Sequence, residues 1–144
     1  MIKCVCLLAA ITIFVSCNVR RKDKVADGIV SMEEMAAHDT TTVKIIDSLY
    51  NFGTVTEGEK VAYNFRFTNS GNKPLIVTNT TASCGCTVPE KPEKPVLPGE
   101  TAFIKVVFNS KGKVGHNEKT ITVTSNANPA FPPLLLKGEV SPAK

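Results

Sequence analysis

Residues 61–68 read Val-Ala-Tyr-Asn-Phe-Arg-Phe-Thr, and this stretch decides the fold. Large apolar side chains at positions 61, 63, 65 and 67 alternate with small or polar ones. A period of two places alternate side chains on opposite faces of an extended chain, whereas a helix repeats about every 3.6 residues. The stretch therefore predicts a β-strand with one face packed in a core and the other face in water.

The same pattern extends along the chain in both directions. Ile121 and Val123 alternate with threonines, whose β-branched side chains suit a pleated sheet. Residues 102–108 are largely apolar on both faces, which is typical of a central strand. The other candidate strands are Ile45–Val55, Leu75–Thr80 and Leu134–Val140. Turn signals rich in glycine, asparagine and proline separate the segments, at 57–58, 69–72, 98–99, 111–115 and 126–129. Short strands at this spacing predict one all-β sandwich or barrel, over residues 43–141.

Four prolines, Pro89, Pro92, Pro95 and Pro98, recur at every third residue. This spacing favours an extended, polyproline-like segment. The segment cannot be a central strand, because proline donates no hydrogen bond to a ladder. We expect it to cover a sheet edge or to cross between sheets, and a Pro-x-x-Pro ligand for another domain is the alternative.

The amino terminus has the layout of a secretory signal. Lys3 precedes an apolar run over residues 4–15, and Ser16-Cys17 follows the run. About a dozen apolar residues are too few for a helix to cross a bilayer, which takes about 20, so residues 1–16 are predicted to be removed. A cysteine directly after the small residue resembles the lipobox of bacterial lipoproteins. We therefore expect a lipid on Cys17, and cleavage that leaves a free thiol there is the alternative.

Residues 17–42 are predicted to form a tether between the lipid and the domain. They are mostly polar or small. Ser31-Met32-Glu33-Glu34 fits a capping box and allows a short helix through Ala37, which needs packing partners to be stable. At the other terminus, residues 142–144 form a short tail.

Charge and histidine content narrow the function classes. Removal of residues 1–16 takes away only Lys3, so 16 basic and 13 acidic side chains remain and the net charge is +3. This charge is too small to indicate a nucleic-acid partner. The basic cluster at 20–24 lies beside the anchor, where it suits anionic headgroups or a solvated tether. Only His38 and His116 are present, so the sequence offers few candidates for the catalytic histidine of a Ser-His-Asp hydrolase.

With these residues laid out, the chain resembles a bacterial family of domains of unknown function, number 1573. The matching segments run almost the length of the domain. They are FGTV (52–55), FRFTNSG (65–71), PLIV (74–77), SCGCTVP (83–89), PGE (98–100), IKVVF (104–108), KTI (119–121), SN (125–126) and LKGEV (136–140). The resemblance implies an immunoglobulin-like antiparallel β-sandwich of about seven strands, related to the PapD pilus-chaperone and major-sperm-protein modules. It implies no established reaction.

Two of these segments also have a local structural interpretation. Asn69-Ser70-Gly71-Asn72 is expected to supply positive φ angles for a hairpin. Pro98-Gly99 is typical of a tight turn before a strand. Both motifs build the fold and need no active site to explain them.

The cysteines leave one chemical constellation in the domain. Cys4 and Cys6 depart with the signal and Cys17 carries lipid, so Cys84 and Cys86 are the remaining thiols. An oxidising compartment favours a disulfide between them. The ring is very small, and we expect Gly85 to supply the backbone freedom that closing it demands. Strain in such a bridge would make it easier to reduce.

Three interpretations of Cys84-Gly85-Cys86 remain open. In the first, the pair is a local clip and the domain is a binding or scaffolding module that uses its sheet edges and loops. In the second, the pair exchanges disulfides with a substrate, with Lys91 or Lys94 supplying positive potential. In the third, Cys84 and Cys86, with His116 as a weak third ligand, bind a soft metal such as copper or zinc.

The sequence favours the first interpretation. We expect a non-enzymatic lipoprotein of the cell envelope that binds another envelope protein and has no cofactor. The absence of an acidic residue after Cys17 favours the outer membrane. We expect the protein on the periplasmic face of that membrane.

Overall fold

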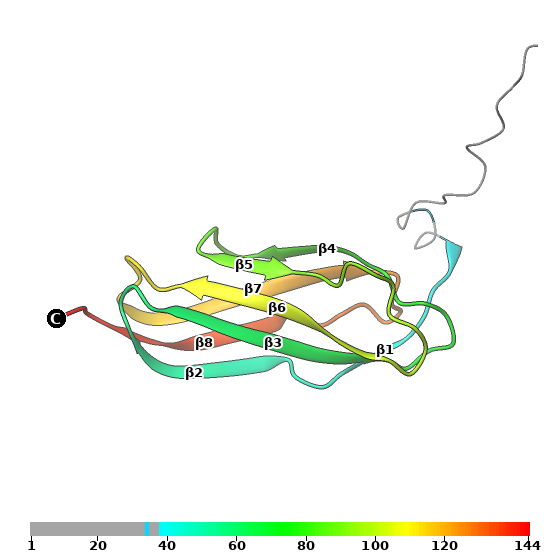
Figure 1. Cartoon of the computed structure of the whole chain (residues 1–144), viewed down its shortest axis with the longest axis horizontal. Coiled ribbons are helices and arrows are strands. Elements are labelled where there is room, and N and C mark those ends of the chain that lie inside the picture. Colours follow the sequence, from blue (N-terminus) through cyan, green and yellow to red (C-terminus); the bar gives the residue numbers. More distant parts are fainter. Residues whose placement is uncertain (1–33, 35–37) are drawn as a thin grey trace, which may run out of the picture.

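The computed structural model describes residue 34 and residues 38–144. The predicted signal, the predicted lipid attachment at Cys17 and the predicted capping-box helix, apart from Glu34, lie outside the described residues. Eight strands make up the fold (Figure 1). They are β1 (Val43–Ile45), β2 (Leu49–Thr56), β3 (Lys60–Asn69), β4 (Val77–Ala82), β5 (Thr87–Glu90), β6 (Thr101–Asn109), β7 (Gly115–Ser125) and β8 (Leu134–Ser141). No helix in this part of the chain is long and apolar enough to cross a membrane.

The strands form two four-stranded sheets that pack face to face. The first sheet has the order β1-β3-β6-β5 and the second has the order β2-β8-β7-β4. This arrangement is an immunoglobulin-like β-sandwich and confirms the predicted fold class. All neighbouring strands are antiparallel except β2 and β8, which run parallel from the Leu49–Leu135 pair onward. Sequence analysis did not anticipate this parallel pair.

Two of the eight strands go beyond the six candidates named from the sequence. One is β5, and the other arises because the predicted strand Ile45–Val55 is divided between the two sheets. β1 pairs with β3 up to Ile45, and β2 pairs with β8 in the other sheet from Leu49. At the crossing, the Asp47 carboxylate accepts two hydrogen bonds from the Arg66 guanidinium, at 2.7 and 3.2 Å. These bonds hold the pKa of Asp47 below its usual value, against a smaller opposing effect of burial. The ion pair therefore fixes the point where the chain changes sheets.

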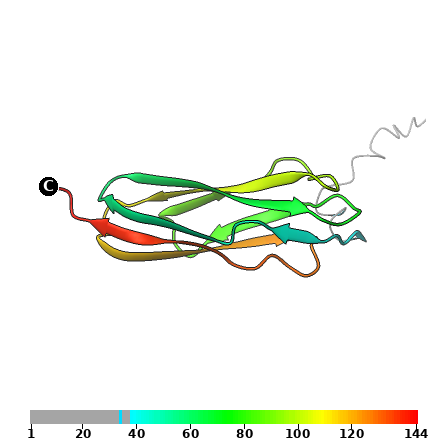
Figure 2. The same cartoon turned by 90° about the horizontal axis from the view of Figure 1, so that it is seen from below.

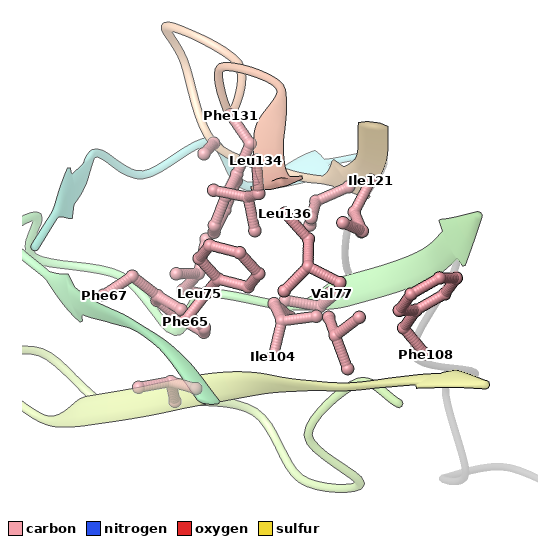
Figure 3. Close-up of a cluster of buried hydrophobic side chains, with 14 of the residues drawn as sticks. Phe65, Phe67, Leu75, Val77, Ile104, Phe108, Ile121, Phe131, Leu134 and Leu136 are labelled. Atoms are coloured by element: carbon pink, nitrogen blue, oxygen red, sulfur yellow. The ribbon is translucent and has the colours of Figure 1, made fainter. Parts of the chain in front are cut away.

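Alternate side chains of β3 fill the core, as the opening stretch of sequence predicts. Phe65 and Phe67 are fully buried, and Tyr63 packs edge-on against Phe65 with ring centroids 4.9 Å apart. Facing residues from the second sheet, among them Leu134, Leu136 and Ile121, complete the core between the layers (Figure 3). Each large apolar side chain buried in this way contributes about 1.5–3 kcal/mol. The core therefore depends on the period-two pattern.

The proline-rich segment lies at an edge, as predicted. Pro89 is in β5, the edge strand of the first sheet, and β6 is the central strand beside it. Residues 91–100 then return to β6. Within them, Val96 forms reciprocal backbone hydrogen bonds of 2.9 Å with Leu75, so Leu75 lies in this bridge and not in β4. The Leu97 carbonyl accepts from the Glu100 amide at 3.0 Å with Gly99 at φ +81°, which confirms the predicted Pro98-Gly99 turn.

The loops gather at two opposite ends of the sandwich. The N-terminal end holds the incoming residues 39–42 and the loops 70–76, 91–100 and 126–133. The cysteine end holds the turns 57–59, 83–86 and 110–114, together with the C-terminal residues 142–144. Figures 1 and 2 show these two ends at opposite extremes of the long axis. Residues 84–86 therefore lie toward the end opposite the incoming chain, but the β4–β5 turn stops short of the extreme that the β2–β3 and β6–β7 turns reach (Figure 1).

The hairpin predicted at Asn69–Asn72 is wrong. β3 and β4 belong to different sheets, and Gly71 has no positive φ. Gly71 instead lies where the incoming chain passes, so that an added Cβ would meet Thr41 Oγ1 and the Thr42 amide nitrogen, the latter at 2.6 Å. Glycine is needed here for close backbone approach and not for turn geometry.

Candidate functional site

The cysteine turn, residues 83–86, links the edge strands of the two sheets. It leaves β4 in the second sheet and enters β5 in the first. The Ser83 amide donates to the Thr120 carbonyl at 2.9 Å, and the Thr120 amide donates to Ser83 Oγ at 3.1 Å. On the other side, the Asn109 amide donates to the Cys86 carbonyl at 2.9 Å. Backbone bonds to both sheets therefore hold the turn independently of its sulfur atoms.

Cys84 and Cys86 are joined by a disulfide, with their Cα atoms 5.4 Å apart. Both residues are half-buried, and Cys86 packs against the hydrophobic core. The Thr87 hydroxyl lies 3.8 Å from the Cys84 sulfur and 3.9 Å from the Cys86 sulfur. In the chain-entropy description, closing so short a loop stabilises a fold by roughly 1.5 kcal/mol, well below the contribution of a long-range bridge.

Gly85 does not play the steric role that we expected. Its φ lies outside the left-handed region, and a Cβ added to it would meet nothing within 4 Å. The turn is exposed at this residue, so no neighbouring atom crowds it. An L-residue with a side chain therefore fits at position 85.

Lys119 brings a positive charge to the inner side of the cysteine end. It lies on β7, and its Nζ is 5.4 Å from the centre of the Phe108 ring. Burial lowers the pKa of Lys119, with a smaller contribution from repulsion by Lys113. Among the described residues, no acidic side chain forms an ion pair with Lys119. A cation that is half-buried and unpaired is an uncommon feature in so small a domain.

Sequence analysis assigned this charge to the wrong lysines. Lys91 and Lys94 follow β5 toward the N-terminal end and lie away from the cysteine turn. A usable signal was present, because the alternation that points Ile121 and Val123 inward also points Lys119 inward. A lysine at an inward position of a strand therefore indicated the site.

His116 is not brought together with the cysteines as a metal site. It lies on strand β7, in which Gly115 already pairs with Val140. Its side chain is 71% exposed, and its Nδ1 lies 3.8 Å from Glu139 Oε2 across the strand pair. Within residues 38–144, no group of three potential metal ligands forms. The structure therefore brings together only two of the three proposed ligands.

A second candidate site is the outer face of the first sheet. Phe103 and Val88 project from it, with exposed fractions of 52% and 56%. Val107 stands between Val88 on one neighbouring strand and Ala62 on the other, which makes an apolar band across the sheet. Beside Phe103 is a shallow hollow of about 260 Å³, which is lined by Glu90, Lys91, Pro92, Thr101, Ala102, Phe103 and Lys105.

Charged groups form part of the rim of this hollow. Lys105 Nζ lies 3.0 Å from Glu90 Oε2, on the neighbouring strand. The pair joins two exposed side chains and contributes little to stability. An apolar floor with a charged rim is the usual composition of a protein contact surface.

Comparisons with solved structures agree with the fold. A protein of unknown function from Porphyromonas gingivalis W83 is 15% identical, with a TM-score of 0.62, over 70% of this chain and 47% of that one. The PapD-like domain 7 of human CEP192 is 12% identical, with a TM-score of 0.54, over 73% of this chain and 89% of that domain. The secreted serine protease VesC of Vibrio cholerae is 14% identical, with a TM-score of 0.53, over 69% of this chain and 23% of the protease. At these identities the likeness concerns the fold alone.

The chain thus spans less than half the length of the Porphyromonas and Vibrio proteins that it matches. No curated protein matches it in sequence. The family model for the protein of unknown function DUF1573 matches residues 43–140, which takes in seven strands completely and all but the last residue of β8. This chain therefore belongs to the DUF1573 family.

Proposed function

We propose that the chain is a lipid-anchored protein of the cell envelope whose immunoglobulin-like domain is a non-catalytic module that binds another envelope protein. The observation that carries this proposal is the outer face of the first sheet. Phe103 is an aromatic side chain half in water, beside a hollow that can receive an apolar side chain. Aromatic residues in such positions dominate the energy of protein interfaces.

The position of the incoming chain supports the proposed anchoring. A lipid on Cys17 tethers the molecule through residues 18–38, and residues 39–42 join the sandwich at its N-terminal end. The long axis of the sandwich separates that end from the cysteine turn. A protein held in this way on the periplasmic face of the outer membrane presents its sheets and its cysteine end to neighbouring proteins.

Site-specific photo-crosslinking in intact cells tests both parts of the proposal. The full chain carries a photoreactive amino acid in place of Phe103, or in place of Thr122, which is exposed on the outer face of the other sheet. We expect a discrete adduct in the membrane fraction from position 103 and none from position 122. In a chain with Cys17→Ala, the protein is expected to move to the soluble periplasmic fraction.

Two results would contradict the proposal. Equal crosslinking from positions 103 and 122 would show that the outer face of the first sheet is not a specific contact surface. Retention of the Cys17→Ala chain in the membrane would show that the anchor is not a lipid on that cysteine. A further variant, Phe103→Ala with the photoreactive residue at Val88, is expected to lower the yield of the adduct several-fold, because both side chains belong to the same face.

A further inference from the structure

We infer that the Cys84–Cys86 disulfide is a reversible thiol–disulfide exchange site, in which the ammonium group of Lys119 stabilises the thiolate that forms when the bridge opens. This activity goes beyond the proposed binding function. The turn that carries the bridge is exposed at Gly85, and it lies at the end of the domain opposite the incoming chain. A protein in the envelope can therefore reach it without displacing the sandwich.

The pairing of β4 with β7 places Lys119 beside the cysteine turn. Ala82 pairs with Ile121, and the Ser83 and Thr120 bonds of 2.9 and 3.1 Å continue this pairing by one residue. One residue further along each of these two segments are Cys84 and Lys119. The two residues therefore lie opposite one another just beyond the end of the β4–β7 pair.

The Phe108 ring relates the lysine to the second cysteine. Lys119 Nζ lies over this ring, and Phe108 pairs with Thr87, the residue directly after Cys86. Cys86 itself packs against the core to which Phe108 belongs. A nearby cation favours the charged form of a thiol, and Lys119 has no carboxylate partner among the described residues to neutralise it.

The fold does not depend on the bridge. The two cysteines are only two residues apart, so the disulfide closes a very short loop. The backbone of the turn is held by hydrogen bonds to Thr120 and Asn109, which remain when the sulfur atoms separate. Both redox states are therefore expected to be folded, as a reversible site requires.

The exchange proceeds in two balanced steps with a dithiol on another envelope protein. The partner's thiolate attacks the Cys84 sulfur, which packs less closely against the core than Cys86 does. A mixed disulfide forms, and Cys86 leaves as the thiolate whose charge Lys119 is proposed to stabilise. The partner's second thiol then attacks the mixed disulfide and releases Cys84. The partner gains a disulfide, and Cys84 and Cys86 gain two electrons and two protons. The reverse steps, with a disulfide on the partner, re-form the bridge.

Equilibration of the full chain with reduced and oxidised glutathione tests the inference. The fraction reduced is measured at pH 7 by alkylation and mass spectrometry. In the reduced chain, the thiolate fraction of each cysteine is taken from the pH dependence of alkylation. We expect Lys119→Met to lower this fraction at pH 7 about three- to tenfold, since a single nearby charge shifts a thiol pKa by about half to one unit. Lys119→Arg, which keeps the charge, is expected to stay within about twofold of the parent. Lys44→Met, the same change on exposed β1, is the matched control and is expected to have no effect.

The parent chain alone already provides a test, whatever the variants do to folding. The bridge is expected to open in reduced glutathione while the circular dichroism spectrum still shows the folded sandwich. A bridge that stays closed until the chain unfolds would overturn the inference. Equal thiolate fractions at pH 7 for Lys119→Met and Lys44→Met would remove Lys119 from it. With oxidised glutathione, Cys86→Ser should form a mixed disulfide at Cys84 faster than Cys84→Ser does at Cys86, and equal rates would contradict attack at Cys84.

Discussion

The N-terminal end of the sandwich and the cysteine turn, residues 83–86, are held by different chemistry. At the N-terminal end, buried amide side chains bind the backbone of several loops at once. At the cysteine end, the turn 83–86 is held by a few backbone bonds and a covalent bridge near the surface. The N-terminal end is therefore held together by buried hydrogen bonds. The cysteine turn instead carries the disulfide, a bond near the surface that a thiol can open and re-form.

Asn69 is the centre of the N-terminal end. It is 0% exposed, and its Nδ2 donates to the Lys73 carbonyl at 2.7 Å and to the Val96 carbonyl at 2.8 Å. Its Oδ1 accepts from Thr41 Oγ1 at 3.0 Å and from the Gly71 amide at 3.1 Å. One side chain thus joins the incoming chain, the β3–β4 loop and the β5–β6 loop.

Asn126 repeats this arrangement on the second sheet. Its Nδ2 donates to the Asp39 and Pro74 carbonyls at 2.7 and 3.0 Å, and its Oδ1 accepts from the Ile76 amide at 2.8 Å. At the cysteine end, the buried Ser110 and Asn117 bind the neighbouring turns in the same manner. The contrast is therefore with the cysteine turn itself, which has no buried amide of its own.

The largest expected effect comes from removing the central amide. Asn69→Ala leaves the buried Thr41 hydroxyl, the Lys73 carbonyl and the Gly71 amide without the Asn69 side chain as partner, and takes one of its two hydrogen bonds from the Val96 carbonyl. It is expected to lower the free energy of unfolding by about 3–4 kcal/mol. Urea denaturation measures this. Asn64→Ala, on the exposed face of the same strand, is the control and is expected to change stability by less than about 0.5 kcal/mol. Similar losses for both variants would show that the amide does not lock this end.

The sequence predicts the sandwich better than it predicts the buried hydrogen bonds of Asn69. The alternation from Val61 to Phe67 predicts the core directly, because a strand's inward face is a local property. The role of Asn69 depends on Thr41 and Val96, which are 28 and 27 residues away in the chain, so no local pattern contains it. The division of Ile45–Val55 between the two sheets could not be predicted for the same reason, because it depends on the long-range contact of Asp47 with Arg66.

The candidate site was predictable in its covalent part and missed in its electrostatic part. Counting cysteines left Cys84 and Cys86 as the two thiols of the domain. The neighbouring charge was sought close in sequence, at Lys91 and Lys94, whereas strand pairing brings Lys119 to the turn. The pairing of strands far apart in the sequence brings Lys119 to the turn. In the sequence, only the period-two pattern of β7 indicates that Lys119 points inward.

A pair of glycine substitutions compares the two ends directly. Gly71→Ala places a Cβ against Thr41 and the Thr42 backbone and is expected to cost about 2 kcal/mol, as overpacking does. Gly85→Ala places a Cβ in open space at an ordinary φ and is expected to be neutral within about 0.5 kcal/mol. Both are measured by thermal and urea unfolding. A large loss for Gly85→Ala would show that closing the bridge needs glycine after all.

Removal of the bridge is expected to have a moderate effect. The double variant Cys84→Ser, Cys86→Ser should lower the free energy of unfolding by about 1.5 kcal/mol, because so short a loop constrains the unfolded chain only slightly. Reduction of the parent chain with dithiothreitol should give the same loss, which separates the bridge from any effect of the serine hydroxyls. A loss above about 4 kcal/mol would make the bridge a structural staple and would place the two ends in one class.

The smallest expected effect concerns Asp47, which belongs to neither end and marks where the chain changes sheets. Hydrogen bonds from Arg66 lower the pKa of Asp47 in the folded state from its usual 3.8, so the ion pair stabilises the fold above that pH. This contribution falls as the pH drops from about 4 through the folded-state pKa. Asp47→Asn should therefore flatten the acid side of the stability profile below about pH 4 and leave its neutral part nearly unchanged, with Arg66→Met giving the same flattening. Because Arg66 is more than half exposed, added salt should shrink the difference, and a salt-independent difference would instead indicate a rigid, water-excluded crossing.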